Sequence, residues 1–251
     1  MPGRRPTPAV RRLAAALLCA AAALAVPAAG AGGLQLTPTQ LSLSARGQAN
    51  GLWLINGGES ALQAQVRVFR WIQDGGEERF EPSRALAVSP PMLELAPGAR
   101  QLVRVIRLGP PPAAEESYRL IVDELPPARG ERKPGLQFVL RYSVPVFLAA
   151  AGDPPTAPQL GAALSFDGDR ASLEVRNRGD RHAQLADLAF VDERGQRHPV
   201  AAGLLGYVLP GQRMRWPLTA PAALLRGAGT LKARINGEPT EQALALDPPA
   251  R

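Results

Sequence analysis

The sequence predicts an all-β protein with two β-sandwich domains. Glycine and proline supply 25 and 26 of the 251 residues, a share that suits short strands joined by turns and is high for a helical protein. Hydrophobic residues make up 45% of the chain and charged residues 20%, which excludes a disordered or collagen-like chain and allows packed cores. Short runs of alternating or β-branched residues, separated by turn signals, recur along most of the sequence.

The first element is an export signal. Residues 1–31 hold four arginines and no acidic residue, then an apolar run from Leu13 to Val26, and end in the small residues Ala29-Gly30-Ala31. This run is shorter than the roughly 20 residues that span a bilayer, so we predict a secretory signal peptide and not a transmembrane helix. The single cysteine, Cys19, lies within it. The mature chain therefore has no thiol for disulfides, thiolate metal sites or catalysis.

The net charge gives no indication of nucleic-acid binding. The formal charge of +7 includes the four arginines of the signal, and without them 25 basic residues face 22 acidic residues. Because this small excess is spread along the chain, neither a nucleic acid nor an anionic membrane surface is an expected partner.

The first sandwich is predicted over residues 32–150. Turn signals at Asn56-Gly57-Gly58, Asp74-Gly75-Gly76 and Pro97-Gly98 separate its strands. The candidate strands are Leu34 to Leu36, Gln40 to Ser44, Ala49 to Ile55, Ala61 to Gln73, Leu86 to Ser89, Met92 to Leu95, Arg100 to Leu108, Tyr118 to Glu124 and Leu136 to Leu148.

A second, smaller β domain is predicted over residues 151–240, after a Gly-Asp-Pro-Pro linker at residues 152–155. The tail over residues 241–251 has little to pack and is predicted to be flexible. The candidate strands of the second domain are Ala162 to Phe166, Ala171 to Asn177, Gln184 to Val191, Gly206 to Leu209, Gln212 to Leu218 and Gly229 to Ile235.

The strand from Leu136 to Leu148 is the strongest functional signal. It is more than twice as long as an average strand of about 5–6 residues. Its second half suits the core face of a sandwich, whereas its first half follows a polar loop and is predicted to extend past the sheet as an exposed edge. Such an edge promotes aggregation unless it has a partner. One parity of the strand is apolar or aromatic throughout: Leu136, Phe138, Leu140, Tyr142, Val144, Val146 and Leu148.

Little in the sequence indicates catalysis or metal binding. His182 and His198 lie in polar, turn-like stretches without an acidic residue at ligand spacing, and both are predicted to lie at the surface. Trp53 and Trp71 lie on apolar strands and are predicted to pack in the core. The sequence shows no phosphate-binding loop before a helix and no nucleophile elbow, so we expect neither an enzyme nor a cofactor.

Several stretches of the first domain resemble the periplasmic chaperones of the chaperone-usher pathway, which escort pilus or surface-fibre subunits in bacteria. Their order and spacing follow the family over most of this domain. Asn177 and Asn236 also stand where the weaker second-domain motifs of the family would put asparagine. The matching stretches are Leu52-Trp-Leu-Ile-Asn56, Val88-Ser-Pro-Pro-Met-Leu-Glu-Leu-Ala-Pro-Gly98 before Gln101-Leu-Val-Arg-Val105, Tyr118-Arg-Leu-Ile-Val-Asp-Glu-Leu-Pro-Pro127, and the long strand itself.

The resemblance implies two immunoglobulin-like β-sandwich domains in a boomerang arrangement with a cleft between them. It also implies donor-strand complementation, in which the chaperone inserts its long strand into a pilin subunit that lacks the last strand of its own sandwich. By alignment the donor residues are Leu136, Phe138, Leu140 and Tyr142. The implied partners are pilin or fimbrial subunits and an outer-membrane usher, and the implied location is the periplasm. No cofactor, metal or membrane-embedded segment is implied.

The sequence departs from the family pattern in the cleft. Members hold the C-terminal carboxylate of the subunit with an arginine of the first strand and a lysine of the long strand, but Gln40 and Pro145 stand at these positions. The Ser143-Val-Pro-Val-Phe147 segment resembles the archaic branch of the family. Arg104 and Arg141 are the candidates to replace the pair as the carboxylate anchor, because arginine offers a carboxylate a bidentate fork.

A second departure concerns the contact between the two domains. Among the charged residues that bridge the domains in the family, Glu124 has its counterpart here, while Ala149 and Gly237 stand where its partners would be. We therefore expect packing, and not a network of salt bridges, to set the angle of the cleft.

The alternative function is an exported structural or adhesive module with immunoglobulin-like domains. Such a module should not leave an apolar edge strand unpaired, so the exposure of Leu136 to Leu140 separates the two hypotheses. A free chaperone must also protect that edge, which predicts a self-capping homodimer in which two copies cover each other's strands.

Overall fold

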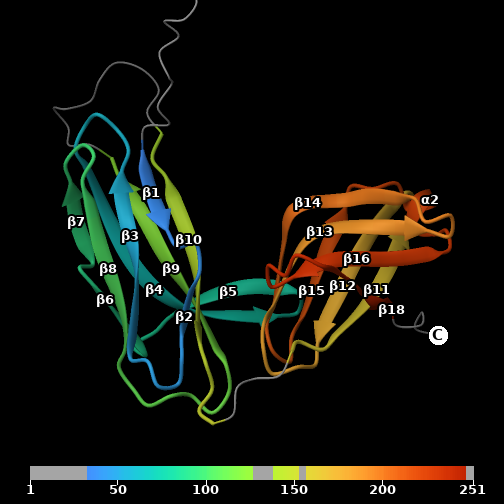
Figure 1. Ribbon diagram of the computed structural model, residues 1–251, viewed down its shortest axis with the longest axis horizontal. Coiled ribbons are helices and arrows are strands. Elements are labelled where there is room, and N and C mark those ends of the chain that lie inside the picture. Colours follow the sequence, from blue (N-terminus) through green and yellow to red (C-terminus); the bar gives the residue numbers. More distant parts are fainter. Residues whose placement is uncertain (1–32, 127–137, 153–156, 247–251) are drawn as a thin grey trace, which may run out of the picture.

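The computed structural model consists of two β-sandwiches set at an angle to each other, which confirms the predicted all-β fold (Figure 1). It describes residues 33–126, 138–152 and 157–246, so the predicted signal peptide lies outside the described residues. The single helix among them is one turn, α2 (Ala222–Leu225). None of the helical structure in these ranges is long and apolar enough to cross a membrane.

The first sandwich packs a four-stranded sheet against a six-stranded sheet. The four-stranded sheet has the order β1-β3-β8-β6, from β1 (Leu34–Thr37), β3 (Ala49–Asn56), β8 (Arg100–Arg107) and β6 (Leu86–Ser89). The six-stranded sheet has the order β2-β10-β9-β4-β5, with β7 also paired to β4. Its strands are β2 (Leu41–Leu43), β10 (Arg141–Leu148), β9 (Glu116–Leu125), β4 (Leu62–Asp74), β5 (Glu77–Pro82) and β7 (Met92–Leu95).

Alternation along the strands decides which residues fill the first core. In β9 the side chains of Tyr118, Leu120 and Val122 are buried between the two sheets, while the side chains between them lie on the outer face. The apolar parity of β10 continues this core with Val144, Val146 and Leu148. The outer face of the six-stranded sheet is therefore the face that carries Arg119, Pro145 and their neighbours.

The second sandwich consists of two four-stranded sheets, with the orders β15-β12-β11-β18 and β14-β13-β16-β17. Its core is a separate cluster that includes Leu173, Leu185, Phe190 and Leu231. The strands are β11 (Leu160–Asp167), β12 (Arg170–Asn177), β13 (Ala183–Asp192), β14 (Arg197–Val208), β15 (Arg213–Leu218), β16 (Gly229–Ile235), β17 (Glu241–Ala243) and β18 (Ala245–Leu246).

Several elements differ from the sequence prediction. Of the strand predicted over Leu136 to Leu148, β10 begins only at Arg141, and the described residues 138–140 before it are not in a strand. Strand β14 begins at Arg197 and not at Gly206.

The prediction of a flexible tail from residue 241 is wrong for residues 241–246, because β17 pairs with β16, β18 pairs with β11, and Leu244 between them is buried. Strand β5 was not predicted, because its sequence is mostly charged and every residue in it is exposed. It forms by backbone pairing with β4 across a turn in which Gly75 and Gly76 have φ of 63° and 90°, values that favour glycine.

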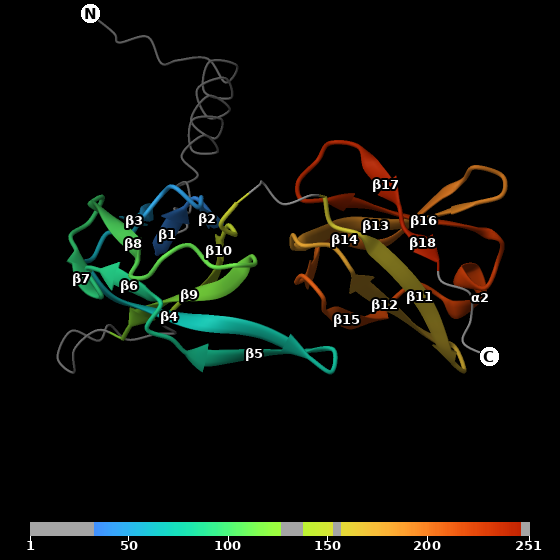
Figure 2. The same ribbon diagram turned by 90° about the horizontal axis from the view of Figure 1, so that it is seen from below.

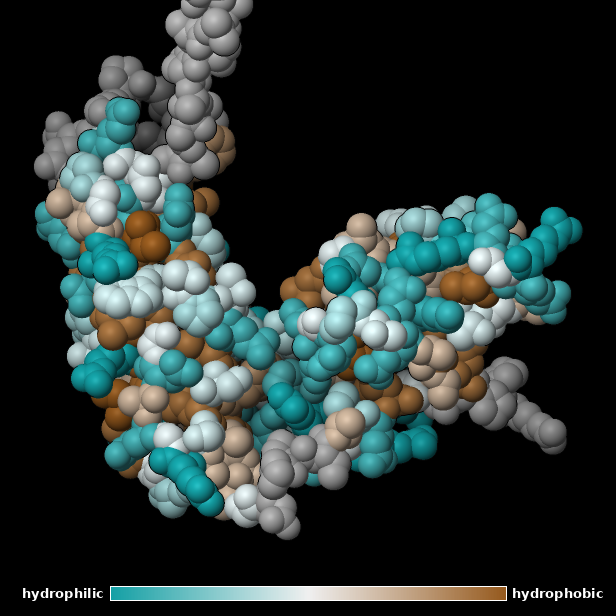
Figure 3. Space-filling model, in the orientation of Figure 1, coloured by the Kyte–Doolittle hydropathy of each residue, from teal (hydrophilic) through white to brown (hydrophobic). Residues whose placement is uncertain are grey.

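The β4–β5 hairpin extends from the first sandwich toward the second (Figures 1 and 2). At its tip, Gly76 forms a parallel bridge with Met214 of β15. Beside this contact the space-filling view shows a hollow between the two sandwiches (Figure 3), which we call the interdomain cleft. The outer face of the six-stranded sheet is turned toward the cleft, because Trp71 and Phe147 on this face contact the second sandwich.

Candidate functional site

One edge of β10 is covered over only part of its length. On one side β10 pairs with β9 along all of its residues, from Arg141 to Leu148. On the other side β2 covers only Val146 to Leu148. In the part of the chain that the structure describes, no strand pairs with the outer edge of residues 141–145. This backbone edge can accept a strand from another chain.

The residues just before β10 expose a row of apolar side chains. Phe138 is 78% exposed, Val139 50% and Leu140 38%. Phe138 and Leu140 share the parity of the buried residues Val144 and Val146, so they continue the core row beyond the end of the sandwich. The backbone at Leu140 is fixed to β9, because its carbonyl accepts a hydrogen bond from the N–H of Glu124 at 2.9 Å.

The other two predicted donor residues have different surroundings. Tyr142 packs partly against the first core, and its hydroxyl donates a hydrogen bond to the carbonyl of Leu34. Leu136 lies outside the described residues.

A buried carboxylate holds the start of β10 on the cleft side. Asp123 of β9 is bonded by Arg67 Nη2 at 2.6 Å and by Arg141 Nε. Burial would raise the pKa of Asp123, but the hydrogen bonds and charges of Arg141 and Arg67 outweigh it and lower the pKa. Together with Leu140 these three residues line a shallow pocket of about 420 Å³.

The structure does not bring the two candidate anchor arginines together. Arg104 is exposed on β8, in the four-stranded sheet, and points away from the core because Val103 and Val105 point into it. Arg141 is paired with Asp123 at the far end of β10 from the second sandwich. As anchors for a carboxylate the two arginines stay a prediction.

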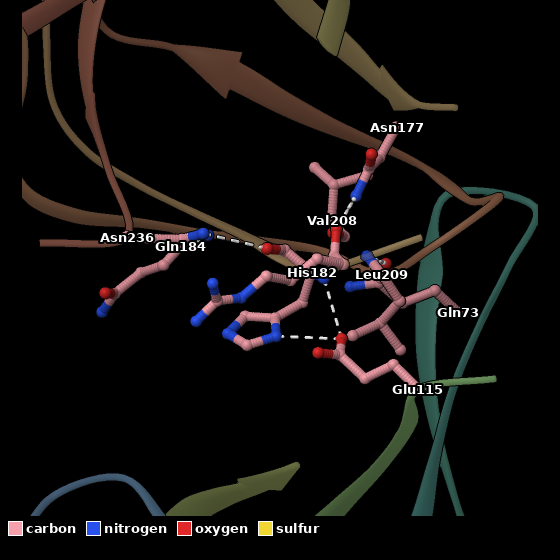
Figure 4. Close-up of polar contacts among 9 residues, drawn as sticks. Gln73, Glu115, Asn177, His182, Gln184, Val208, Leu209 and Asn236 are labelled. Carbon is pink, nitrogen blue, oxygen red and sulfur yellow. Dashed lines mark hydrogen bonds and ion pairs between the residues drawn. The ribbon is translucent and has the colours of Figure 1, made fainter. Parts of the chain in front are cut away.

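Glu124 is not where the resemblance places an interdomain contact. It lies near the end of β9 that is distant from the second sandwich, and its Oε2 accepts a hydrogen bond from the N–H of Leu140 at 3.3 Å. The acidic contact to the second sandwich comes instead from Glu115, just before β9. Its Oε1 accepts from the backbone N–H of His182 at 2.8 Å and lies 2.9 Å from His182 Nδ1 (Figure 4).

His182 corrects a second prediction. It is 4% exposed and not a surface residue, because its ring stacks on Phe147 of β10 with 3.4 Å between ring centroids. Gln73 at the end of β4 makes a further polar contact across the domains. Its side-chain NH₂ donates to the carbonyl of Tyr207 at 2.8 Å, and its side-chain oxygen accepts from the N–H of Leu209 at 2.8 Å. Gln73 and Leu209 are labelled in Figure 4.

Aromatic packing supports these polar contacts. Trp71, Phe147, Tyr207 and Leu209 form a buried cluster that joins the two sandwiches. Trp71 is thus buried as predicted, but between the domains and not in a sandwich core. This packing and the contacts of Glu115 and Gln73 join the two sandwiches. That packing sets the angle of the cleft stays a prediction.

Sequence reasoning also missed Arg119 of β9. It is 8% exposed, and its guanidinium carbon lies 3.6 Å from the centroid of the Trp71 ring. The sequence does contain one indication of this site. Arg119 is a charged residue inside the apolar run Tyr118-Arg-Leu-Ile-Val122, on the face of the predicted strand that points away from the sandwich core.

The remaining candidates stay apart from this region. His198 is partly buried and bonded to Asp192, with Nε2 3.1 Å from Oδ2. Trp53 is 37% exposed on the outer face of β3, with the guanidinium of Arg100 4.9 Å from its ring, so the prediction that it packs in the core is wrong. The described residues contain no group of three or more potential metal ligands.

Comparison with solved structures identifies chaperone-type folds. One match is a chain of the CsuC–CsuE chaperone–tip adhesion subunit pre-assembly complex from archaic chaperone-usher Csu pili of Acinetobacter baumannii, with a TM-score of 0.66 and 24% identity, covering 85% of this chain and 97% of that chain. The E. coli chaperone DraB has a TM-score of 0.58 and 19% identity, covering 86% and 97%. A chain of the Salmonella enterica SafA pilin–SafB chaperone complex has a TM-score of 0.59 and 19% identity, with the same coverage of 86% and 97%. At these identities the likeness establishes the fold.

No curated protein sequence matches the chain. A family model does match residues 33–152, and it is described as the pili and flagellar-assembly chaperone, PapD N-terminal domain. This range contains the first sandwich with the partly covered β10 edge and the exposed apolar row. The first domain of this chain thus matches the family of pili and flagellar-assembly chaperones, in the PapD-type N-terminal domain.

Proposed function

We propose that this protein is a periplasmic chaperone that captures pilin or fimbrial subunits by donor-strand complementation and delivers them to an outer-membrane usher. The observation that carries the proposal is the uncovered outer edge of residues 141–145, which continues the exposed apolar residues Phe138 and Leu140. A free backbone edge that is continued by exposed apolar side chains suits a strand that is donated to a partner.

The chemistry of capture follows from the parity of the strand. Leu136, Phe138 and Leu140 are the donor residues that fill the groove of the subunit, and Tyr142 is the fourth at the margin of the chaperone's own core. Burial of each large apolar side chain stabilises the complex by about 1.5–3 kcal/mol. The backbone edge supplies strand pairing, so the binding needs neither ATP nor a metal.

The archaic branch is the subgroup that we propose, on the basis of the Ser143-Val-Pro-Val-Phe147 segment. The likeness to a complex from archaic Csu pili is in keeping with it. For the free protein we propose the self-capping homodimer, because each copy exposes the same apolar row. Sedimentation at increasing concentration checks this, and a chain that stays monomeric at high concentration contradicts it.

Intact-complex mass spectrometry tests the function. The tagged protein is purified from the periplasm of its native host, with the fibre genes expressed, as the wild type and as a Phe138→Glu, Leu140→Glu double variant. We expect a stoichiometric partner of roughly 150 residues, typical of one domain, that the double variant loses. The matched control is Leu108→Glu with Leu204→Glu, two residues that are 61% and 57% exposed elsewhere.

The alternative, an exported structural or adhesive module, predicts a different result. In that case the purified wild type would carry no bound subunit, and the mass spectrum of the double variant would show the same result.

A further inference from the structure

The outer face of one sheet in the second sandwich brings three arginines together. Arg176 of β12 and Arg213 and Arg215 of β15 point outward, because they alternate with the buried core residues Val175 and Met214. The side chains of Arg176 and Arg215 are 49% and 60% exposed. We call the three residues the β12–β15 arginines. They concentrate positive charge on two neighbouring strands, although the mature chain as a whole has only a small excess of basic residues.

A single carboxylate, that of Glu174, pairs with these arginines. Its Oε1 accepts from Arg176 Nε at 3.0 Å and its Oε2 from Arg215 Nη2 at 3.1 Å. Burial would raise the pKa of Glu174, but the hydrogen bonds of Arg215 and Arg176 and the charges of Arg176 and Arg213 lower it overall. Arg213 forms no ion pair with any residue that the structure describes. Three arginines against one glutamate leave an excess of two positive charges in this group.

Two of the cations oppose each other across the sheet. Arg176 lies directly opposite Arg213 in the antiparallel pairing of β12 with β15. Side chains in such positions have Cβ atoms about 4.5–5.5 Å apart, and like charges there are destabilising. On the other side of Arg176, β11 presents only Gly161, and its next outward residue is Ala163. These small residues leave a low shelf beside the arginine. An anion between the two guanidinium groups would turn their repulsion into attraction.

The hairpin of β4 and β5 separates Arg213 from Arg215. Gly76 at its tip forms a parallel bridge with Met214, and Figure 2 shows this tip beside β15. In a parallel pairing the residues on either side of the bridge also lie next to each other, so Gly75 flanks Arg213 and the acidic residue Glu77 flanks Arg215. Arg213 therefore has a glycine on one side and Arg176 on the other. These two arginines are the uncompensated pair.

We propose that Arg176 and Arg213 form a binding site for a phosphate group on the outer face of the second sandwich. A guanidinium offers a phosphate a planar fork of two N–H donors, and two cations match the double charge of a phosphate monoester. Glu174 bonds the Nε of Arg176, which leaves both Nη groups of that arginine for the ligand. The site lies in the other sandwich from the donor edge, so it does not depend on the proposed function. A free phosphate compound and a lipid headgroup both present this group.

Titration with inorganic phosphate tests the site. Sodium phosphate replaces sodium chloride at constant ionic strength, and the backbone N–H signals of β12 and β15 are followed by NMR. We expect saturable shifts at Arg176 and Arg213. Arg194→Gln, which alters an exposed arginine in the turn between β13 and β14, is the matched control and should bind phosphate as the wild type does. The absence of a saturable shift at β12 and β15 in the wild type would overturn the site.

Substitutions at Arg213 separate a built site from general attraction to positive charge. Arg213→Gln should weaken phosphate binding about tenfold, and Arg213→Lys, which keeps the charge but not the fork, should give an intermediate affinity. Because Arg213→Gln also removes the like-charge pair, its melting temperature in phosphate-free buffer should be no lower than that of the wild type. Phosphate should raise the melting temperature of the wild type but not of Arg213→Gln. Equal phosphate affinity in the wild type and Arg213→Gln would contradict the proposal.

Vesicles distinguish the two sources of the phosphate group. The full chain is sedimented with vesicles of phosphatidylcholine alone and of phosphatidylcholine with phosphatidic acid, whose headgroup is a bare phosphate. Binding to the phosphatidic acid vesicles that an Arg176→Gln, Arg213→Gln double variant loses would assign the site to a lipid surface. Binding of inorganic phosphate without vesicle binding would assign it to a soluble phosphate compound. Vesicle binding that the double variant retains, together with no response to inorganic phosphate, would overturn the site.

Discussion

The two sandwiches share one arrangement of side-chain to backbone hydrogen bonds, which is centred on Asn56 in the first and on Asn177 in the second. Both are buried, with exposures of 0% and 1%. In each, the side-chain NH₂ donates to the carbonyl of the residue four positions later, which is Ser60 or Arg181. It also donates to a carbonyl just before a Pro-Gly turn, that of Leu95 or Val208. The side-chain oxygen accepts from the N–H two positions later, that of Gly58 or Gly179. The backbones of both asparagines also pair with the residues of that turn.

Both sandwiches have a partly covered edge, and they differ in what continues it. In the second, β18 pairs in parallel with β11 over only Gly161 and Ala162. In the first, β2 pairs in parallel with β10 over only Val146 to Leu148. The comparison teaches that a partly covered edge does not by itself distinguish the two sandwiches. The difference lies in Phe138 and Leu140, which continue the edge of β10 and are 78% and 38% exposed.

The largest effect is expected from breaking the shared arrangement of hydrogen bonds. Asn56→Ala and Asn177→Ala each remove three or more side-chain hydrogen bonds and leave buried carbonyls without a donor, so each should lower the free energy of unfolding by about 3 kcal/mol. Urea unfolding followed by circular dichroism measures the loss. Gln101→Ala, an exposed residue with one local bond, is the control. A cost below about 1 kcal/mol at either asparagine contradicts the equivalence.

A smaller effect is expected where the two sandwiches meet. His182→Ala removes the side-chain bond to Glu115 and the stacking on Phe147, and should cost about 2 kcal/mol. It should also separate the unfolding of the two domains into two calorimetric transitions. His198→Ala is the matched histidine control, because His198 bonds only within the second sandwich to Asp192 and its side chain is 27% exposed. Equal costs for the two histidines would contradict the interdomain role.

The sequence allowed us to predict the features that depend on neighbouring residues along the chain. Alternation along the chain predicted most strands and the apolar row that the structure exposes at Phe138 and Leu140. It missed the contacts that join residues distant in the chain. Glu115 and His182 are 67 positions apart, and each lies in a polar stretch that is typical of exposed residues. Arg119 is buried between Trp71 of its own sandwich and Tyr207 of the second sandwich, which is 88 positions away in the chain.

The smallest effect that we predict concerns one carboxylate in each sandwich that lies between two arginines. Asp123 lies between Arg67 and Arg141, and Glu174 of β12 lies between Arg176 and Arg215, with side-chain exposures of 12% and 13%. For both, burial would raise the pKa, but the hydrogen bonds and charges of the arginines lower it overall. A lowered pKa in the folded state stabilises the fold above the unfolded pKa, about 3.9 for aspartate and 4.3 for glutamate.

Asp123→Asn and Glu174→Gln should therefore each cost about 1 kcal/mol at pH 7, because partly exposed ion pairs contribute little. The difference from the wild type should shrink as the pH falls through the folded pKa and vanish once the wild-type carboxylate is protonated. Urea unfolding at a series of pH values measures this. The two variants should differ in function. Asp123 is paired with Arg141 at the start of the proposed donor edge, so Asp123→Asn should also reduce the subunit occupancy. Glu174→Gln should leave the subunit occupancy unchanged. Equal occupancy in both would show that the carboxylate serves only stability in the first sandwich, as it does in the second.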